Sequence, residues 1–485
     1  MLSRVVNIFK SDELRGKFAR GGVILSVGSF AEIFSRFLRN VILTKLLAPD
    51  LLGMFATIHS VVLLTEAFTE VGVRQAIIQN KKGGSSDFVN VAWWFSAIRG
   101  LLLYAAAYLA APTICGFYAR PDLLVPMRAA FVVILLHGLV SPRMYVLEKE
   151  MRFFKYAIMK QGVAVLNVAV AVVFSLFYKS CWPLIAGLIV EFASTFVLSF
   201  LLVPFKPRFS IDRASFSDIM FYARRMIGLP LFTSIFLQFD VLIVPKFFSF
   251  NDAGLYAVAR GFALMPILAF TKTIRPMVLP AFSKMQDSKE KLKEAILKST
   301  DLTVVVSGPF VAFCIVFAAP LLSFLYKPKY AAVAAAFAIL MLYVVIRLLS
   351  TILMQLYFAL AKPELQRRFS LTRLAVIALM IYPAIEVMGF DGVPTTVAAG
   401  MLTVLVMQIF YAGSLVGLRP VEYCKSLVRG SYYSGAVVLG GLAVRHLFEG
   451  PDLIALVMGG AFCLAAWAVA LSTAHYKMIL LGNRN

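Results

Sequence analysis

Charged side chains recur within two stretches of the chain that are otherwise strongly apolar, residues 21–82 and 222–283. Inside a membrane such groups can do electrostatic chemistry: guanidinium groups bind phosphate oxygens through paired N–H donors, and carboxylates can carry a coupling ion. A cation near the bilayer centre costs about 2.5–3.5 kcal/mol on insertion scales, so each needs a partner or a cavity. The first stretch contains Glu32, Arg36, Arg39, Glu66, Glu70 and Arg74, and the second contains Asp240, Arg260, Lys272 and Arg275.

The spacing of these charges predicts helices with one polar stripe, because residues three and four apart share a helix face. The stripes are Ser29, Glu32, Arg36 and Arg39 in one helix and His59, Glu66, Glu70 and Arg74 in the next. A shift of 201 residues aligns Gly53 with Gly254 and Arg74 with Arg275, which indicates an internal repeat. We therefore expect two six-helix lobes, each opening with a polar-faced helix pair that faces a shared cleft, as in many transporters.

Several of these charges also have a purely structural interpretation. Glu32 with Arg36, and Glu70 with Arg74, are four residues apart, so each pair could neutralise itself inside a bundle. Asp240 has no basic residue one helical turn away, which leaves a cross-helix ion pair or a proton or sodium site. For His59, a packed and hydrogen-bonded ring is the more common role. Both interpretations stay open at this stage.

The composition is that of an integral membrane protein. The 485 residues are 61% hydrophobic and 15% charged, with a mean hydropathy of +0.85. The net charge of +22 is spread between apolar segments rather than clustered, which favours membrane topology and contact with anionic phospholipid over nucleic-acid binding. The five cysteines have neither disulfide nor metal-site spacing, so no metal and no cofactor is expected.

The hydrophobic segments predict an all-α protein with fourteen transmembrane helices, since about 20 apolar residues cross a bilayer. The expected spans are residues 21–46, 52–72, 88–111, 123–144, 156–177, 182–203, 219–244, 253–282, 296–318, 330–361, 369–387, 393–416, 431–447 and 453–476. They group into a basic amphipathic segment at 1–20, an N-lobe at 21–203, a cytoplasmic linker at 204–218, a C-lobe at 219–416 and two further helices at 431–476.

Most lysines and arginines between the spans fall in one alternate set of loops, which places both termini in the cytoplasm. The opposite set contains Lys45, Arg120, Lys179, Lys246, Lys327, Lys329 and Arg445. The longest loop, near residues 283–295, has a charge pattern typical of a short surface helix. No loop is large enough for a catalytic domain, so a membrane enzyme is disfavoured, and no catalytic residue is assigned. Pro266, Pro276 and Pro280 predict a bent eighth span, with a cleft-lining role or simple packing as alternatives.

At this level the chain resembles the Wzx-type polysaccharide flippases of the multidrug/oligosaccharidyl-lipid/polysaccharide exporter superfamily. The resemblance lies in LTKLLAPDLLGMFATIHSVVLLTEAFTEVGVRQAIIQ, in DVLIVPKFFSFNDAGLYAVAR followed by RPMVLPAFSKMQD, and in FYARPDL, LEKEMRFFKYA, FLYKPKYAAV and YFALAKPE. It covers most of residues 21–364. Relatives more often have glycine and tryptophan where this chain has Pro328 and Tyr330.

The resemblance implies a carrier in the bacterial inner membrane that moves undecaprenyl-pyrophosphate-linked oligosaccharides by alternating access for lipopolysaccharide or exopolysaccharide synthesis. It implies no cofactor, with H⁺ or Na⁺ as coupling ion, and a polysaccharide polymerase and export machinery as partners. The family's cationic cavity would correspond here to Arg36, Arg39, Arg99, Arg260, Arg275 and Arg347, and ion-coupling candidates are Asp240, Glu66, Glu70 and Glu32. Alternatives are a lipid II flippase, a multidrug cation exporter of the same fold and, in another class, a glycan-assembly enzyme.

Overall fold

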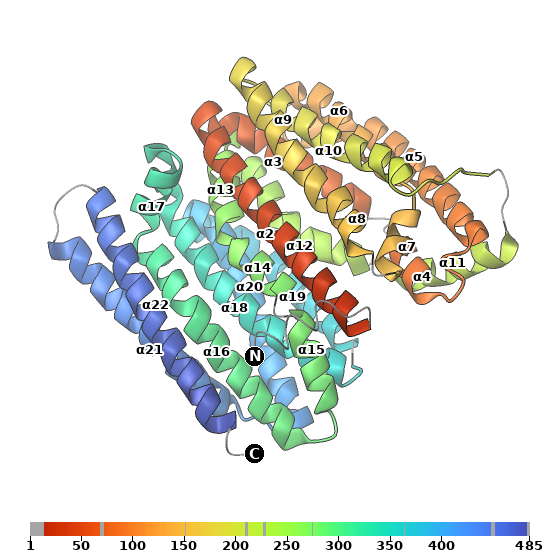
Figure 1. The fold of residues 1–485 in the computed structure, drawn as a ribbon. Coiled ribbons are helices and arrows are strands. Elements are labelled where there is room, and N and C mark those ends of the chain that lie inside the picture. The colour runs from red at the N-terminus through yellow and green to blue at the C-terminus, as the bar shows by residue number, and fades with distance from the viewer. Residues whose placement is uncertain are drawn as a thin grey trace. The chain divides into compact units, whose positions relative to one another are not determined.

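The computed structural model describes residues 14–67, 72–150, 152–208, 212–226, 229–273, 275–362, 364–447 and 452–482, and all regular secondary structure in them is helical (Figure 1). The first half contains α2 (Leu14–Leu46), α3 (Pro49–Ala67), α4 (Val73–Gln79), α5 (Ser86–Phe117), η1 (Pro121–Leu123), α6 (Leu124–Leu139), α7 (Arg143–Lys149), α8 (Phe153–Ala157), η2 (Ile158–Gly162), α9 (Val163–Phe177), α10 (Trp182–Leu201), α11 (Arg213–Met226) and α12 (Leu229–Phe247). The second half contains α13 (Phe250–Ala263), α14 (Met265–Thr273), α15 (Arg275–Lys284), α16 (Lys289–Val316), α17 (Ala318–Leu325), η3 (Pro328–Val333), α18 (Ala334–Ala359), α19 (Glu364–Met388), η4 (Gly389–Asp391), α20 (Gly392–Val416), α21 (Pro420–Leu447) and α22 (Asp452–Gly482).

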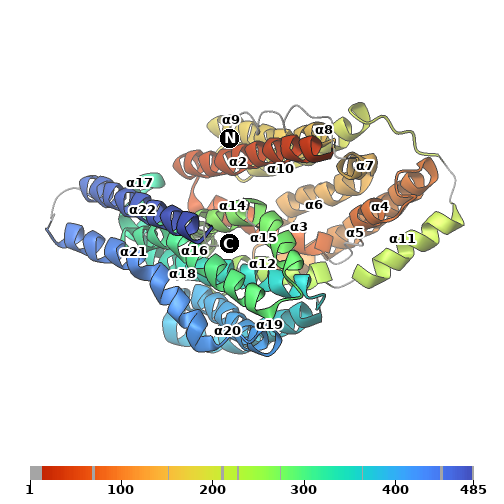
Figure 2. The ribbon, with the colours of Figure 1, turned by 60° about the horizontal axis from the view of Figure 1, so that its bottom comes forward.

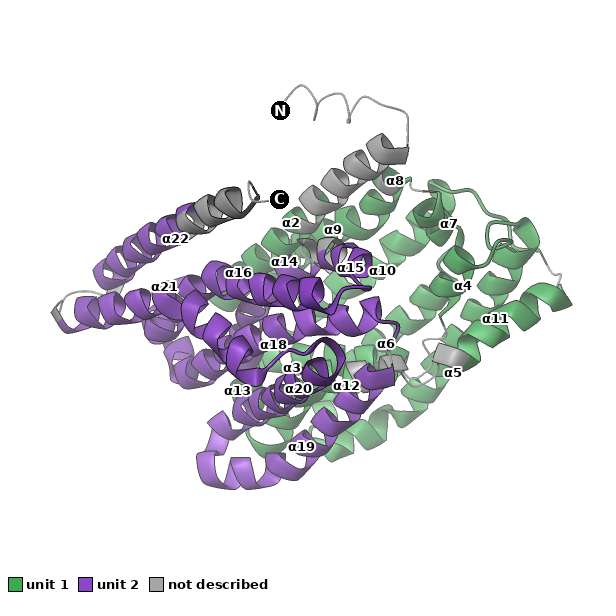
Figure 3. Cartoon of the chain, turned by 90° about the horizontal axis from the view of Figure 1, so that it is seen from below, with its two compact units in different colours: residues 1–254 green, residues 255–485 purple. Residues whose placement is uncertain are grey.

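The chain divides into two compact units at Gly254, unit 1 being Met1–Gly254 and unit 2 Leu255–Asn485 (Figure 3). Unit 1 includes α12, which packs on α3. The lobes expected from the sequence, residues 21–203 and 219–416, remain a prediction. Each unit has a hydrophobic core of its own, described separately below.

The core of unit 1 forms where α3, α5, α6 and α10 pack together. Ile58, Ala130, Phe131 and Ile185 are completely or almost completely buried there. A second cluster, around Ile77, packs the short helix α4 against α5 and α11. Helix α11 begins after Asp212, whose carboxylate accepts a hydrogen bond from the Ser215 amide at 2.8 Å. Bonds from the side chain and backbone of Ser215 lower the pKa of Asp212.

The core of unit 2 is centred on α18, which packs against α15, α16 and α20. Val344, Leu353 and Leu356 of α18 are fully buried. The last two helices, α21 and α22, run along α16 and contact each other (Figures 1 and 2). Many large side chains exposed on both units, such as Phe177 and Val387, are apolar. This is the pattern of helices that face lipid rather than water.

Each of the fourteen expected spans overlaps a helix, but the count of fourteen crossings remains a prediction. Among the described residues, nine helical stretches are long and apolar enough to cross a membrane, the longest of which joins α19 and α20. The protein is therefore an all-helical, multi-pass membrane protein. The bend expected in the eighth span is present near Pro266, where α13 ends at Ala263 and α14 begins at Met265. A proline cannot donate a backbone hydrogen bond to the preceding turn. Residue 274, before Pro276, lies outside the described residues, and Pro280 lies inside α15.

One local prediction was wrong, and a second falls mostly outside the described residues. Residues 289–295 are not a separate surface helix but the first turns of α16, because Ser288 caps that helix by accepting from the Lys291 amide. The amphipathic segment expected at 1–20 lies outside the described residues as far as residue 13, and from Leu14 it is continuous with α2. In both places apolar and polar stretches share one uninterrupted helix.

The repeat-related glycines Gly53 and Gly254 meet at a very close backbone contact in unit 1. A Cβ at Gly53 would lie 2.0 Å from the Phe250 carbonyl oxygen, and one at Gly254 would lie 1.8 Å from the Pro49 carbonyl oxygen. The contact is reciprocal, because Pro49 and Phe250 are also 201 residues apart. Only glycine allows two backbones to approach so closely.

We expect Gly53→Ala to lower the free energy of unfolding of the detergent-solubilised protein by about 1–3 kcal/mol, because the added methyl group must displace backbone atoms. The variant should therefore melt at a lower temperature. Gly116→Ala is the matched control, since a methyl group added there would meet nothing within 4 Å. Loss of the monodisperse peak on size-exclusion chromatography as a function of temperature measures the effect. Equal melting curves for the two variants would show that the Gly53 approach does not matter.

Candidate functional site

Five polar side chains form a connected network within unit 1, on α2, α9 and α10. Arg36 Nη2 donates to Glu191 Oε1 at 3.2 Å, and Arg36 Nε lies 3.4 Å from Glu32 Oε1. The Asn167 amide donates to the other oxygen of Glu191, and Asn167 Oδ1 accepts from Arg39 Nη1 at 3.5 Å. The expected pair of Glu32 with Arg36 is thus present, but a second carboxylate from another helix also holds Arg36.

Arg39 is less well satisfied than Arg36. Its one hydrogen bond is the long contact to Asn167, and its buried Nε has no partner among the described residues. Glu191 contributes to the electrostatic environment of Arg39 but is already bonded to Arg36 and Asn167. A guanidinium carries five N–H donors. Arg39 therefore retains donors and positive charge for an anion.

Glu66 and His137 join α3 to α6. Glu66 Oε1 and His137 Nδ1 are 3.0 Å apart, with the two side chains 16% and 31% exposed. His59, on the same helix as Glu66, stacks its ring on Phe55 with centroids 5.6 Å apart. The stacking fits the structural interpretation of His59. The Glu66–His137 pair instead places two titratable groups in contact between membrane helices, where a proton could be exchanged.

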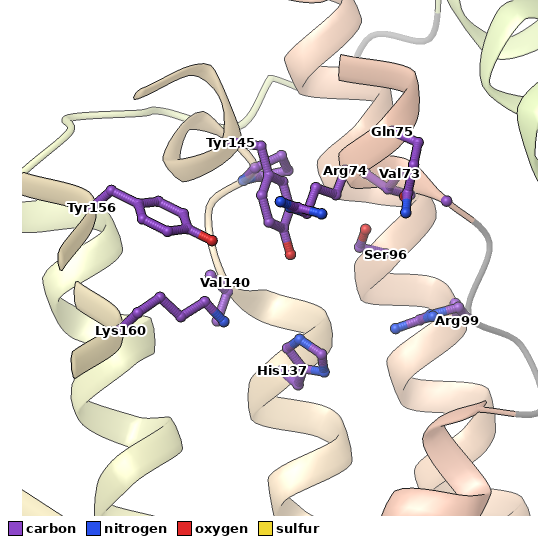
Figure 4. A pocket seen from close by; sticks show the side chains of 12 residues that line it. Val73, Arg74, Gln75, Ser96, Arg99, His137, Val140, Tyr145, Tyr156 and Lys160 are labelled. Atoms are coloured by element: carbon purple, nitrogen blue, oxygen red, sulfur yellow. The ribbon is translucent and has the colours of Figure 1, made fainter. Parts of the chain in front are cut away.

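A cavity of about 260 Å³ lies beside this pair, within unit 1 (Figure 4). Its walls come from α4, α5, the end of α6, the turn into α7, and the α8–η2 segment. The side chains of Lys160, Tyr156 and Tyr145 extend toward the same space, with Arg74, Arg99 and His137 on the facing wall (Figure 4). The lining residues are Gly72, Val73, Arg74, Gln75, Ser96, Arg99, His137, Val140, Pro142, Tyr145, Tyr156 and Lys160.

Two of the cations in this cavity differ in their pairing. Arg74 is bound in a forked arrangement by Glu148 of α7, with Nε donating to Oε2 at 2.9 Å and Nη2 to Oε1. This hydrogen bonding raises the pKa of Arg74, which keeps it charged. Lys160 projects from η2, one turn of π-helix between α8 and α9, and makes no hydrogen bond or ion pair with a described residue. π-Helical turns are often found at functional sites.

Unit 2 holds half-buried cations of its own. Arg347 of α18 donates to the Tyr343 hydroxyl at 2.5 Å and lies over the same ring, and it has no carboxylate partner among the described residues. Arg373 of α19 donates to Met401 Sδ at 3.3 Å and is an electrostatic neighbour of Arg347 and Tyr343. Arg260 lies on α13 and is half-buried. Arg347 and Arg373 thus bring positive charge together from two helices.

The remaining candidates are placed as follows. Asp240, on α12, is 2% exposed, and its Oδ1 accepts from the Val241 amide at 3.0 Å. Glu70 lies outside the described residues. Arg275 begins α15, but its side chain and that of Lys272 also lie outside the described part. Arg99 is half-buried and lines the cavity. The predicted roles of these residues remain predictions.

Several members of these groups carry little signal in the sequence. Lys160 and Arg373 lie near the starts of the expected spans 156–177 and 369–387, and position along a span is the only guide to depth that the sequence offers. Asn167, His137, Tyr145 and Tyr156 were not singled out, since none forms a charged pair within its own helix. An asparagine, a histidine and a lysine within apolar helices were the available signal, because polar residues are rare there.

The fold and these charged interiors define a class: a multi-pass helical membrane protein of the kind that carries substrates across the bilayer. Residues 42–335 match the family described as "Polysaccharide biosynthesis protein". The match covers more than half of the chain, so this protein belongs to that family.

Two relatives illustrate the family. The chain is 20% identical to the lipopolysaccharide biosynthesis protein WzxC of Escherichia coli (strain K12) over 448 residues, 90% of this chain and 89% of that one. It is also 20% identical to the teichuronic acid biosynthesis protein TuaB of Bacillus subtilis (strain 168) over 411 residues, 84% and 80% of the two chains. Among solved structures, the lipid II flippase MurJ in an inward closed conformation shares the fold, with a TM-score of 0.77, 14% identity and coverage of 94% of this chain and 100% of that one.

Proposed function

We propose that this protein is a flippase for lipid-linked oligosaccharides. It moves undecaprenyl-pyrophosphate-linked repeat units from the inner to the outer leaflet of the bacterial inner membrane by alternating access, for lipopolysaccharide or exopolysaccharide synthesis. The same proposal includes fourteen membrane spans with both termini in the cytoplasm. It also includes a polysaccharide polymerase as the downstream partner. The basic cytoplasmic loops would contact anionic phospholipid.

One observation carries the proposal. Arg39 in unit 1 and Arg347 in unit 2 are guanidinium groups in membrane helices whose hydrogen-bond partners among the described residues are neutral. Holding such a charge in a membrane without a carboxylate costs free energy. A pyrophosphate offsets this cost when it is bound, because its oxygens match the paired donors of arginine.

Arg128 shows that an arginine without a carboxylate is not by itself a binding site. Its guanidinium lies 4.2 Å from the centroid of the Tyr108 ring, and it is in the first two turns of α6. At a span end a cation can reach the headgroups, and the aromatic face offers it a further partner. Neither Arg39 nor Arg347 lies at a helix end, since α2 and α18 continue for at least a turn and a half beyond them. Arg347, like Arg128, also lies over an aromatic ring.

These residues disfavour two of the three alternatives. A multidrug cation exporter would need a site in which acidic groups prevail, whereas both carboxylates around Arg36 are already occupied by that arginine and by Asn167. A lipid II flippase would need the same pyrophosphate-binding groups, because its substrate differs from that of the proposed flippase only in the glycan. A glycan-assembly enzyme would need a carboxylate pair or metal cluster, and no metal-binding group of side chains is found within the described residues.

Reconstitution tests the proposal. Purified protein is inserted into liposomes that contain a fluorescent undecaprenyl-pyrophosphate oligosaccharide, and a membrane-impermeant quencher reports the outer leaflet. We expect the protein to increase the rate at which the inner pool becomes quenched, with the glycan chemically unchanged. Protein-free liposomes are the control. Faster movement of lipid II than of the oligosaccharide would favour that substrate, and a changed glycan without movement would identify an enzyme.

Coupling to H⁺ or Na⁺ completes the proposed mechanism. We infer that the Glu66–His137 pair is the site at which a proton is bound and released, with Asp240 and Glu32 as the other described candidates. The pair bridges α3 and α6, so a change in its protonation alters a contact between two membrane helices. Glu32 is already held by Arg36, so its charge is balanced within the protein and it is the weaker candidate.

A further inference from the structure

The cavity in unit 1 has the properties of a binding site that the arginines of the proposed substrate path do not explain. Four segments distant in sequence bring their polar residues to it: Arg74 from α4, Arg99 from α5, His137 from α6 and Lys160 from η2. Tyr145 and Tyr156 line the same space (Figure 4). A packing defect between apolar helices would be lined by apolar side chains instead.

Lys160 supplies the positive charge that is available to a ligand. Arg74 is held by Glu148, and His137 is bonded to Glu66. Carboxylates at Glu66, Glu191 and Glu148 contribute to the electrostatic environment of Lys160, yet none lies within ion-pair distance of its amine. Lys160 is exposed, and its side chain lines the cavity. A ligand anion would give it the partner that the described residues do not.

The size and lining of the cavity restrict the ligand further. Its volume of about 260 Å³ is near the lower end of the range for small-molecule sites, about 300–1,000 Å³, so a whole oligosaccharide does not fit. Tyr145 and Tyr156 offer flat apolar rings with a hydroxyl at the tip, a combination that suits one sugar ring and its hydroxyl groups. One sugar bearing one phosphate satisfies both the charge and the volume.

We propose that this cavity binds a sugar phosphate, with Lys160 on the phosphate and Tyr145 and Tyr156 on the sugar. Given the proposed function, on which this inference rests, the ligand is the sugar nearest the pyrophosphate of the lipid carrier. The cavity then acts as a selectivity site within unit 1, recognising the part of the headgroup where sugar and phosphate meet. Arg39 and Arg347 recognise the phosphate charge alone.

The test uses the purified full-length protein in detergent and glucose 1-phosphate as the probe, with glucose and inorganic phosphate as partial probes. Isothermal titration calorimetry measures binding. We expect glucose 1-phosphate to bind more tightly than either partial probe. Lys160→Met should weaken its binding roughly ten- to a hundredfold, the effect of losing a hydrogen bond to a charged group. Lys160→Arg should retain most of the binding, and Tyr156→Phe should weaken it severalfold.

The matched control is Lys45→Met, which removes an exposed lysine of unit 1. Thermal melts of each variant establish that the fold is kept, and the separate Tyr156→Phe measurement tests the site even if Lys160→Met is unstable. Unchanged binding by both variants would overturn the inference. The inference would also be overturned if inorganic phosphate bound as tightly as the sugar phosphate. Displacement of the probe by vesicles of phosphatidylglycerol would overturn it as well and would assign the site to phospholipid.

Failure of this inference and failure of the proposed function have different signatures. Liposome transport by the wild-type protein, with binding of glucose 1-phosphate that does not depend on Lys160 or Tyr156, overturns the cavity assignment alone. Binding that depends on Lys160, in a protein that moves no lipid-linked oligosaccharide, overturns the flippase and keeps the cavity as a sugar-phosphate site.

Discussion

Arg39→Ala is expected to abolish surface polysaccharide in cells and to slow transport in liposomes roughly ten- to a hundredfold. Arg39 has a single long hydrogen bond, to Asn167, and no carboxylate at ion-pair distance among the described residues. Its removal therefore takes little from the folded state but takes a charge-assisted contact from the pyrophosphate, worth about 1.5–3 kcal/mol. The liposome quenching assay and immunoblots of membrane fractions measure the two effects separately.

Three variants make this result specific. Arg39→Lys keeps the charge but loses the fork of donors, so we expect partial transport. Arg347→Ala, which removes an arginine of unit 2 that donates to the neutral Tyr343, is expected to act in the same direction. Arg128→Ala is the control, because that arginine lies near a span end over Tyr108. Normal transport by both Arg39→Ala and Arg347→Ala, with normal protein levels, would overturn the assignment of these arginines to substrate.

Glu66→Gln is expected to remove the dependence of the transport rate on the proton gradient. The carboxylate faces His137 across α3 and α6, with His59 and Lys160 as its further titratable neighbours. A glutamine keeps the shape and a hydrogen bond to His137 but cannot take up a proton. Transport rates in liposomes with imposed pH gradients, and separately with imposed sodium gradients, give the coupling directly.

Asp240→Asn is the competing variant, and Asp87→Asn, at the exposed first turn of α5, is the control. We expect Asp240→Asn to alter the dependence of the transport rate on the pH gradient less than Glu66→Gln does. Asp240 is buried, and its carboxylate already accepts a hydrogen bond from the Val241 amide. If the transport rate of Asp240→Asn no longer depended on the pH gradient while that of Glu66→Gln still did, the coupling site would be assigned to α12 instead.

The arrangement around Glu191 explains why Arg36 and Arg39, one helical turn apart, are assigned different roles. Arg36 lies between Glu32 and Glu191, so its charge is balanced within the protein. Asn167 links the same carboxylate to Arg39, which orients that guanidinium without neutralising it. A neutral amide in this position holds the arginine in place while leaving its charge for the ligand. We accordingly expect Arg36, which was a substrate-binding candidate, to position its neighbours rather than to bind the pyrophosphate itself.

The sequence alone determined that the protein is helical and embedded in a membrane, where its helices lie, and which family it resembles. These properties follow from runs of apolar residues and from local signals such as Pro266, which act over a few turns of one helix. The pairing of Glu32 with Arg36 could also be predicted from the sequence, because residues four apart on a helix are neighbours in any fold.

Only the tertiary structure decided which of the buried charges are balanced. Glu191 reaches Arg36 across 155 positions of sequence, and Arg74 binds Glu148, which is 74 positions away on another helix. The cavity around Lys160 likewise depends on a π-helical turn and on four separate segments. Electrostatic energy depends on distance in space, and the order of residues along the chain fixes that distance only within one helix.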